Sequence, residues 1–442
     1  MGRAFGQRRW LKRLGRSLGW MALGITLSWL VSCGSPGGSG AANGNTLEFW
    51  TMQLQPKFTA YFEELIEDFE GSHPGTTVKW LDVPWSAMES KILTAVSAGT
   101  APDVVNLNPT FASKLAERNA WLELGSRLDA PTQESYLDNI WQAAKLEGES
   151  FSLPWYLTTR LTIFNKELLS EAGIEQPPTT YEELATVAAS VREKTGKYAF
   201  FATFVPDDSG EVLESFVQMG ATLVDGQGLA AFESPEGKKA FQFWVDLYKA
   251  GLLPKESLTQ GHRRAIDLYQ AGQTAILSSS PEFMGAIATN APSVAEVSEA
   301  APQVSGETGK VSAAMMTLVV PKQSDQPDLA TEFAAFVTNS ANQLVFAKAA
   351  NVLPSQNEAL SALREELETT AAQATGEDTE AKLVQARRLS AEQLTKADVL
   401  LPPIKNIKLL QSVIYENLQA AMLDEKTVDE AIADAAEAWN QG

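Results

Sequence analysis

Cysteine and histidine, the side chains best suited to covalent and metal chemistry, are scarce in this chain. Its 442 residues include one cysteine, Cys33, and two histidines, His73 and His262. A single thiol cannot form an internal disulfide, and these three side chains are too few for the usual zinc sites, so we expect no metal and no cofactor. A Ser-His-Asp triad would have to use one of the two histidines. The sequence therefore argues against most nucleophilic and metal-assisted catalysis.

Acidic side chains are far more abundant. The chain has 55 Asp and Glu against 35 Lys and Arg, which gives a formal net charge of −20 at pH 7. This balance repels phosphate, so we expect no nucleic-acid partner. Paired carboxylates about 5–5.5 Å apart could serve a retaining glycosidase. No strong catalytic motif accompanies them, so a lipid-anchored glycoside hydrolase stays the alternative, and we predict a protein that is not an enzyme.

The N-terminal residues have the form of a secretory signal. Residues 1–17 carry six basic side chains and no acidic one, and residues 18–31 are uncharged. This apolar run is shorter than the ~20 residues of a membrane-spanning helix. It ends at Ser32-Cys33, as in lipoprotein signals, and a Gly/Ser-rich tether follows. We predict a signal peptide over 1–32, a lipidated Cys33 with a flexible linker over 33–45, and a bacterial cell-membrane lipoprotein that faces the periplasm or the exterior.

Strands alternate with helices in the rest of the chain. Apolar patterning predicts strands at 47–50, 78–81 and 102–107, with helices at 58–71 and 86–99 between them. This alternation is typical of parallel βαβ units and an α/β fold. Residues 356–397, rich in Ala, Glu and Leu, predict one or two long surface helices. The other expected helices cover 181–194, 212–220, 235–250, 262–271, 326–349, 405–423 and 427–440.

Several short motifs follow one another in a familiar order. They are APDVV (101–105), LPWY (153–156), IFNKELL (163–169) and PPTTYEEL (177–184), with further ones at 272–276, 330–336 and 427–431. Together they resemble the extracellular solute-binding proteins of the maltose-binding type, which serve ABC importers for carbohydrates. The resemblance covers about residues 47–438. The helical stretch 356–397 departs from it, because it is longer and more acidic than the family usually shows.

The resemblance implies an α/β, two-lobed periplasmic-binding-protein fold with a ligand cleft and hinge crossings. The first lobe would comprise residues 46–157 with about 313–353, and the second lobe 158–312 with about 354–442. The chain would cross near 157–159, return near 313–316 and cross again near 353–354. The lobes would close over the ligand by hinge bending, the motion that periplasmic binding proteins use. Closure needs ligand contacts that only the closed form makes, so both lobes must supply binding residues.

Sugar chemistry and the resemblance together select the candidate binding residues. A sugar has apolar C–H faces and many hydroxyls, so its site needs aromatic rings and hydrogen-bonding side chains. Open α/β sheets bind ligands beyond the carboxyl ends of their strands. Three tryptophans, Trp80, Trp121 and Trp244, are assigned instead to cores. The candidates are Trp50, Gln53, Gln55, Trp85, Asn108, Thr110, Trp155, Tyr156, Arg160, Asp207, Asp208, Ser280, Glu282 and Met315.

The predicted function is the substrate-binding component of an ABC importer, with a carbohydrate ligand, permease subunits and their ATPase as partners. We expect a monomer that contacts the membrane only through its lipid. Family members often carry a tryptophan where Glu282 follows Pro281, so the identity of the sugar does not follow from maltose. A non-sugar solute, such as a glycerol phosphodiester or a zwitterionic osmolyte, stays open. A phosphate ligand would need a cation in the cleft, and Arg160 is the candidate for that role.

Overall fold

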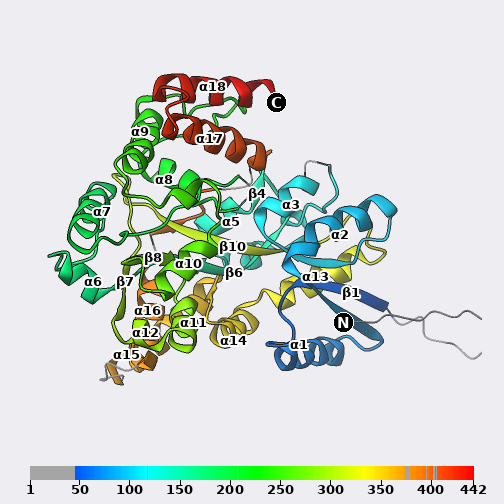
Figure 1. Cartoon of the computed structure of the whole chain (residues 1–442). Coiled ribbons are helices and arrows are strands. Elements are labelled where there is room, and N and C mark those ends of the chain that lie inside the picture. The colour runs from blue at the N-terminus through cyan, green and yellow to red at the C-terminus, as the bar shows by residue number, and fades with distance from the viewer. Residues whose placement is uncertain are drawn as a thin grey trace, which may run out of the picture. The chain divides into compact units, whose positions relative to one another are not determined.

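Two separate β-sheets, each with its own helices, organise the folded part of the chain (Figure 1). The computed structural model describes residues 45–116, 118–206, 208–373, 379–394, 396–401, 404 and 406–442. The predicted signal peptide, Cys33 and linker residues 34–44 lie outside these ranges. Within the ranges, no helix has the length and apolar character needed to cross a membrane.

The larger sheet has the strand order β11-β6-β10-β3-β1-β2, with β12 paired to β10. Strand β1 is parallel to β2 and β3, as the βαβ pattern predicts, whereas β10 is antiparallel to β3 and β6. The strands are β1 (Asn45–Met52), β2 (Thr76–Val83), β3 (Val104–Leu107), β6 (Leu153–Thr159), β10 (Val311–Val319), β11 (Leu353–Pro354) and β12 (Ala397–Asp398).

Helices on both sides of this sheet complete what we call the first lobe. They are α1 (Thr59–Ser72), α2 (Trp85–Ala98), α3 (Pro109–Ala116), α5 (Asp138–Ala143), α13 (Pro327–Val337), α14 (Ser340–Ala350) and α15 (Asn357–Gln373). The connection from α3 to β6 also contains a 3-10 turn (Gly125–Arg127), α4 (Ala130–Glu134) and the hairpin of β4 (Lys145–Leu146) with β5 (Glu149–Ser150). The expected helix 326–349 is two helices, α13 and α14.

The smaller, antiparallel sheet has the order β8-β7-β9 and organises the second lobe. Its strands are β7 (Leu161–Asn165), β8 (Ile276–Ser279) and β9 (Ser298–Pro302). Its helices are α6 (Lys166–Glu171), α7 (Tyr181–Thr195), α8 (Glu211–Gln218), α9 (Pro235–Lys249), α10 (Arg263–Gln270), α11 (Glu282–Asn290), α12 (Pro292–Glu296), α17 (Ile407–Met422) and α18 (Val428–Gln441), with a 3-10 turn at Lys255–Leu258.

Local sequence signals fix several of these boundaries. Thr180 and Glu183 form a capping box at the start of α7, and Thr427 does the same with Glu430 at the start of α18. Such caps satisfy amide groups that the first helical turn leaves without partners. Helix α2 ends at Gly99, whose φ of 72° is left-handed and favours glycine. These three helix ends lie within one residue of the positions that the sequence predicts.

The chain passes between the lobes in three regions. The first crossing runs from β6 to β7 through Arg160, and the second runs from β9 to β10. The third differs from the expected crossing at 353–354, because Leu360 and Leu363 of α15 still pack in the first-lobe core. Helix α16 (Thr379–Gln393) lies across both lobes instead: its Ala386 packs in a second-lobe core and its Ala391 in the first-lobe core. The chain then passes from β12, paired with β10 in the first lobe, to α17 of the second lobe.

Candidate functional site

A cavity of about 950 Å³, which we call the cleft, is lined by residues of both lobes. The first lobe contributes the segments after β1 and β3, the start of α2, and parts of β6 and β10. The second lobe contributes the loop before α8, α8 itself, the start of α11 and the start of α17. The carboxyl ends of the parallel strands β1 and β3 therefore meet the cleft, and this is the edge at which open α/β sheets bind ligands.

Aromatic rings form part of the first-lobe wall. The ring of Tyr156 lies 5.2 Å from that of Phe346, and both residues line the cleft. Burial raises the pKa of Tyr156, and the negative charges of Glu282 and Asp82 raise it further. The phenol therefore keeps its proton and can donate a hydrogen bond. Trp85, at the start of α2, is 43% exposed and offers an apolar face at the rim.

One carboxylate holds the loop that follows β1. Asp82 accepts a hydrogen bond from Thr51 Oγ1 at 2.7 Å and from the amides of Leu54 and Gln55 at 2.9 and 3.0 Å. Because Asp82 belongs to the neighbouring strand β2, these bonds fix the loop to the sheet edge. The side chains that this loop presents to the cleft are thus pre-positioned.

Gln53 and Trp85 occupy adjoining positions at that edge. Gln53 has a φ of 55°, and its side-chain Oε1 accepts a hydrogen bond from Trp85 N at 3.3 Å. The amide of Trp85 is the first of α2 and has no partner within the helix. An amide and an indole are thereby brought together, which suits a ligand with both hydroxyls and apolar faces.

The second-lobe wall is held by a loop at residues 208–210. Asp208 Oδ1 accepts a hydrogen bond from His262 N at 2.7 Å. The carbonyl of Ser209 accepts two more, from Gln411 Nε2 at 2.7 Å and from the Tyr415 hydroxyl at 2.6 Å. Asp208 and Gln411 both line the cleft. The loop is thus fixed on both sides, which favours a preformed wall.

Arg160, in the first crossing, faces two glutamates of α8. Its Nε lies 3.4 Å from Glu214 Oε2, and its Nη1 lies 3.7 Å from Glu211 Oε2. Burial disfavours the charged guanidinium, but Glu214 and Glu211 outweigh this effect and raise the pKa of Arg160. Glu214 itself lines the cleft, and its buried Oε2 has the Arg160 guanidinium as its ion-pair partner.

Two ion pairs join the lobes across the cleft. Lys57 Nζ lies 3.4 Å from Glu282 Oε1, and Lys408 Nζ lies 3.3 Å from Glu89 Oε2. All four side chains line the cleft. Glu89 also pairs with Lys114 of its own lobe. Burial alone would raise the pKa of Glu89, but the hydrogen bonds and charges of the two lysines outweigh it and hold this pKa below its ordinary value.

The cleft brings together many, but not all, of the residues that the sequence selects. Its lining includes Gln53, Trp85, Asn108, Thr110, Tyr156, Asp208, Glu282 and Met315. Asp207 lies outside the described residues. The core assignments hold: Trp121 and Trp244 are each 3% exposed, and Trp80 is half-buried against the first-lobe core. Whether the lining residues contact ligand stays a prediction.

Two of the predicted binding tryptophans belong to cores instead. Trp155 is fully buried, and its ring stacks 4.9 Å from Phe346. Successive residues of a strand point to opposite faces, so Tyr156 takes the cleft side of β6 and Trp155 cannot. Trp50 is 5% exposed and packs with α2, under the ammonium of Lys91 at 4.4 Å.

Three further candidates also lie outside the lining. Gln55 is exposed, and its backbone amide donates a hydrogen bond to Asp82. The carbonyl of Ser280 accepts a hydrogen bond from Phe283 N, which makes Ser280 part of the turn into α11. Arg160 is engaged by α8. Its guanidinium forms ion pairs with Glu211 and Glu214 at the crossing.

The sequence reasoning missed seven charged or polar residues of the lining: Lys57, Ser86, Glu89, Thr158, Glu214, Lys408 and Gln411. Glu89 could have been found, because it follows the predicted Trp85 by four residues on one helix and therefore shares its face. Lys408 and Gln411 share a face of α17 in the same way, but no local signal connects that helix with the cleft.

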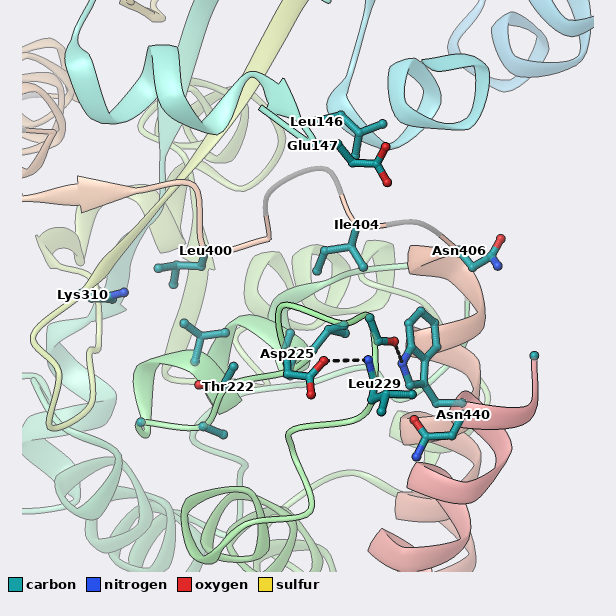
Figure 2. Close-up of a pocket in the computed structure, with 18 of the residues that line it drawn as sticks. Leu146, Glu147, Thr222, Asp225, Leu229, Lys310, Leu400, Ile404, Asn406 and Asn440 are labelled. Carbon is teal, nitrogen blue, oxygen red and sulfur yellow. Dashed lines mark hydrogen bonds between the residues drawn. The ribbon is translucent and has the colours of Figure 1, made fainter. Parts of the chain in front are cut away.

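A second cavity, of about 740 Å³, contains none of the predicted site residues (Figure 2). Figure 2 shows the loop of Asp225 and Leu229 beside Asn440 of α18. Asp225 Oδ1 accepts a hydrogen bond from Leu229 N at 2.9 Å, and Trp439 Nε1 donates to Gly228 O at 3.0 Å. These polar groups bind one another, so the cleft is the better candidate for ligand.

Comparison with known proteins places the chain in a family. Residues 55–344 match the family model of the bacterial extracellular solute-binding proteins. The fold is similar to that of a periplasmic-binding protein assigned to oligosaccharides, from Synechococcus sp. MITs9220, solved in complex with zinc. The TM-score is 0.84 at 48% identity, over 89% of this chain and 98% of that one. In the described part of this chain, no three His, Cys, Asp or Glu side chains are grouped to hold a metal.

More distant relatives agree with this placement. An arabinooligosaccharide-binding protein of Halalkalibacterium halodurans is 24% identical over 310 residues, 67% of this chain and 68% of its own length. The cyclic alpha-maltosyl-1,6-maltose binding protein of Arthrobacter globiformis shares the fold, with a TM-score of 0.75 at 22% identity over 90% of this chain and 98% of its own. A binding protein of Brucella abortus is 22% identical over 256 residues, 58% of this chain and 62% of its own length.

The family model covers more than half of the chain, and the Synechococcus protein is nearly half identical over almost its whole length. The two-lobed fold expected from the sequence is confirmed by these neighbours. The family consists of binding proteins rather than enzymes, as the sequence also predicted. The chain belongs to the bacterial extracellular solute-binding proteins.

Proposed function

We propose that the chain is the substrate-binding component of an ABC importer and captures an uncharged sugar by closing its two lobes. The observation that carries this proposal is the cleft itself, which both lobes line with aromatic rings and with hydrogen-bonding side chains such as Gln53, Asn108 and Gln411. A polar group that lobe closure buries without a partner costs about 1–3 kcal/mol, so closure favours a ligand whose hydroxyls satisfy these side chains. Tyr156 and Trp85 supply the aromatic surfaces that sugar C–H faces prefer.

Charge in the cleft favours a neutral ligand. Lys57 and Lys408 line the cleft, and each faces a glutamate of the other lobe. Arg160, the cation considered for phosphate, faces Glu211 and Glu214. A phosphodiester would have to break one of these pairs and leave a carboxylate without its cation. An oligosaccharide or sugar glycoside needs no such exchange. The relative from Synechococcus is named for oligosaccharide binding, and the one from Halalkalibacterium for arabinooligosaccharide binding.

A thermal-shift panel tests the ligand class. Protein lacking residues 1–33 is heated with mono-, di- and oligosaccharides and with glycerol phosphodiesters. We expect one sugar to stabilise it by about 2.7 kcal/mol at 100 times its dissociation constant. Chromatography should recover that sugar unchanged. A shift with a phosphodiester alone, or no shift with any sugar, would overturn the assignment, and a hydrolysis product would favour the glycosidase alternative.

The envelope attachment is proposed from sequence alone. We infer that Cys33 carries the lipid, that the Gly/Ser-rich residues after it form the tether, and that a monomeric body delivers solute to a membrane permease. Radiolabelled palmitate should label the chain and should not label Cys33→Ser, which should leave the membrane fraction. Membrane retention of Cys33→Ser after high-salt washing would contradict this anchor.

A further inference from the structure

The long helical segment 356–397 departs from the family pattern. Its C-terminal end lies at the other two lobe crossings, the one from β6 to β7 and the one from β9 to β10. Helix α16 packs beside α11 and β9 of the second lobe, and Figure 1 shows it next to α12 and β7. Its partner helix α15 packs in the first-lobe core through Leu363 and Leu367. The α15–α16 pair is therefore anchored in both lobes.

One glutamine of α16 contacts both of the other crossings. Gln393 Nε2 donates a hydrogen bond to the carbonyl of Arg160, in the first crossing, at 3.2 Å. Its Oε1 accepts one from the amide of Gln303, in the second crossing, at 2.8 Å. Gln303 in turn accepts a hydrogen bond from Ser312 N at 2.9 Å, just inside β10. A single carboxamide thus ties the two crossings to each other.

A serine one turn earlier on α16 adds a second tie. Ser390 Oγ lies 2.7 Å from Thr159 Oγ1, the last residue of β6 before the first crossing. Thr159, Ser390 and Gln393 are 1%, 3% and 8% exposed. Separating polar groups that are this deeply buried costs free energy, because water does not replace the lost hydrogen bonds. The contacts thus resist separation of the crossings.

Lobe opening must change the backbone angles at the crossings. If the crossings moved independently, the lobes could twist and slide as well as open. Gln393 couples the crossings through one planar group with fixed donor and acceptor positions, so the axis of bending passes close to it. The coupling fails if either the donor or the acceptor is lost.

We propose that Ser390 and Gln393 of α16 are positioning residues that clamp the hinge and restrict the second lobe to one opening motion. This rests on the proposed function, because it assumes that opening and closing accompany ligand capture. Neither residue lines the cleft, so they act through the crossings and not through ligand.

Distances between spin labels in the ligand-free protein test the clamp directly. Cys33→Ser removes the only thiol, and cysteines are then placed at Lys79 in the first lobe and Glu236 in the second, both exposed. Gln393→Leu should broaden the distance distribution and extend it to longer values. Gln385→Leu is the matched control, because Gln385 lies on the same helix but hydrogen-bonds Ala371 of α15.

Ligand binding provides the second readout. Once a sugar is identified, Gln393→Leu should raise its dissociation constant about threefold to tenfold, because the broader open ensemble leaves a smaller fraction of molecules competent to close. Ser390→Ala removes a single hydroxyl, should fold if Gln393→Leu does not, and should broaden the distribution to a smaller extent. A distribution in either folded variant no broader than that of Gln385→Leu would overturn the clamp. Because that result needs no ligand, it is independent of whether the solute is a sugar.

Discussion

Glu89 receives one lysine from each lobe, and this arrangement allows the contribution of a cross-lobe contact to be measured. Lys408 approaches it from the second lobe at 3.3 Å, and Lys114 approaches it from its own lobe. Only the pair with Lys408 has to break when the lobes separate. Lys408→Ala should therefore weaken ligand binding, whereas Lys114→Ala should leave it nearly unchanged.

The size of the effect follows from exposure. The side chain of Lys408 is 36% exposed and that of Glu89 is 24% exposed, so water still screens the pair. Partly exposed ion pairs contribute about 0.2–1 kcal/mol, and this less exposed pair should lie in the upper half of the range. A loss of about 0.5–1 kcal/mol from the closed form raises the dissociation constant roughly twofold to fivefold.

Salt and pH provide internal checks on the same pair. Binding by the unchanged protein should weaken more between about 0.05 and 0.5 M salt than binding by Lys408→Ala, because screening removes the same attraction. The pKa of Glu89 is held below the ordinary 4.5, so its contribution is present above that value and disappears as the pH falls through the lowered pKa. The difference between the two proteins should shrink over that acidic interval.

Isothermal titration of a ligand from the saccharide panel measures these constants. Lys408 also lines the cleft, so a loss of affinity could reflect a lost ligand contact. Spin-label distances in the ligand-free protein separate the two causes, because only a cross-lobe tie shifts the population from closed to open without ligand. Equal effects of Lys408→Ala and Lys114→Ala, or no change in the ligand-free population, would refute the reasoning.

Three further predictions concern the rim, the core and a surface histidine. Trp85→Ala should weaken sugar binding without lowering the melting temperature, since the ring is 43% exposed; an unchanged dissociation constant would remove Trp85 from the site. Trp155→Ala should lower the unfolding free energy in urea by about 3–5 kcal/mol, and a loss below 1 kcal/mol would contradict its place in the core. The hydrogen bond that His73 donates to the Glu332 carboxylate raises the pKa of His73, so the contribution of this pair to stability is full below the ordinary 6.5 and is lost as the pH rises through the raised pKa. His73→Gln should therefore cost more stability at pH ~5.5 than at pH ~8.5, and the reverse order would contradict the pairing.

The sheets could be predicted because their signals are local. The run at 47–50 alternates, the run at 102–107 is mostly apolar, and the helices between them have apolar residues every three to four positions. The third crossing could not be predicted in this way. Helices α15 and α16 have the same Ala- and Glu-rich composition, and no local pattern shows that Leu363 packs in one lobe and Ala386 in the other.

The candidate site follows a similar division. Gln53 and Asn108 are predictable, because they follow strands whose carboxyl ends meet at one sheet edge. Trp155 is a wrong assignment that alternation could have corrected, since its neighbour Tyr156 already takes the opposite face of the strand. Lys408 reaches the cleft only through the packing of α17 against the second lobe, and a single sequence carries no record of that contact.

The cross-lobe ion pair and the hinge clamp should affect closure in different ways. Glu89 and Lys408 belong to different lobes, so their contact exists only in the closed form and sets how much free energy the ligand must supply. Gln393 binds residues of the crossings themselves, which rotate without separating, so its bonds can persist in the open form and set the path of the motion. Loss of Lys408 should therefore change the fraction of closed molecules, and loss of Gln393 should change the breadth of the open ones. Because the two groups share no partner, their effects on affinity should add within about 0.5 kcal/mol in the double variant. A large departure from additivity would mean that the clamp also depends on the closed contact, and the two roles could not be assigned separately.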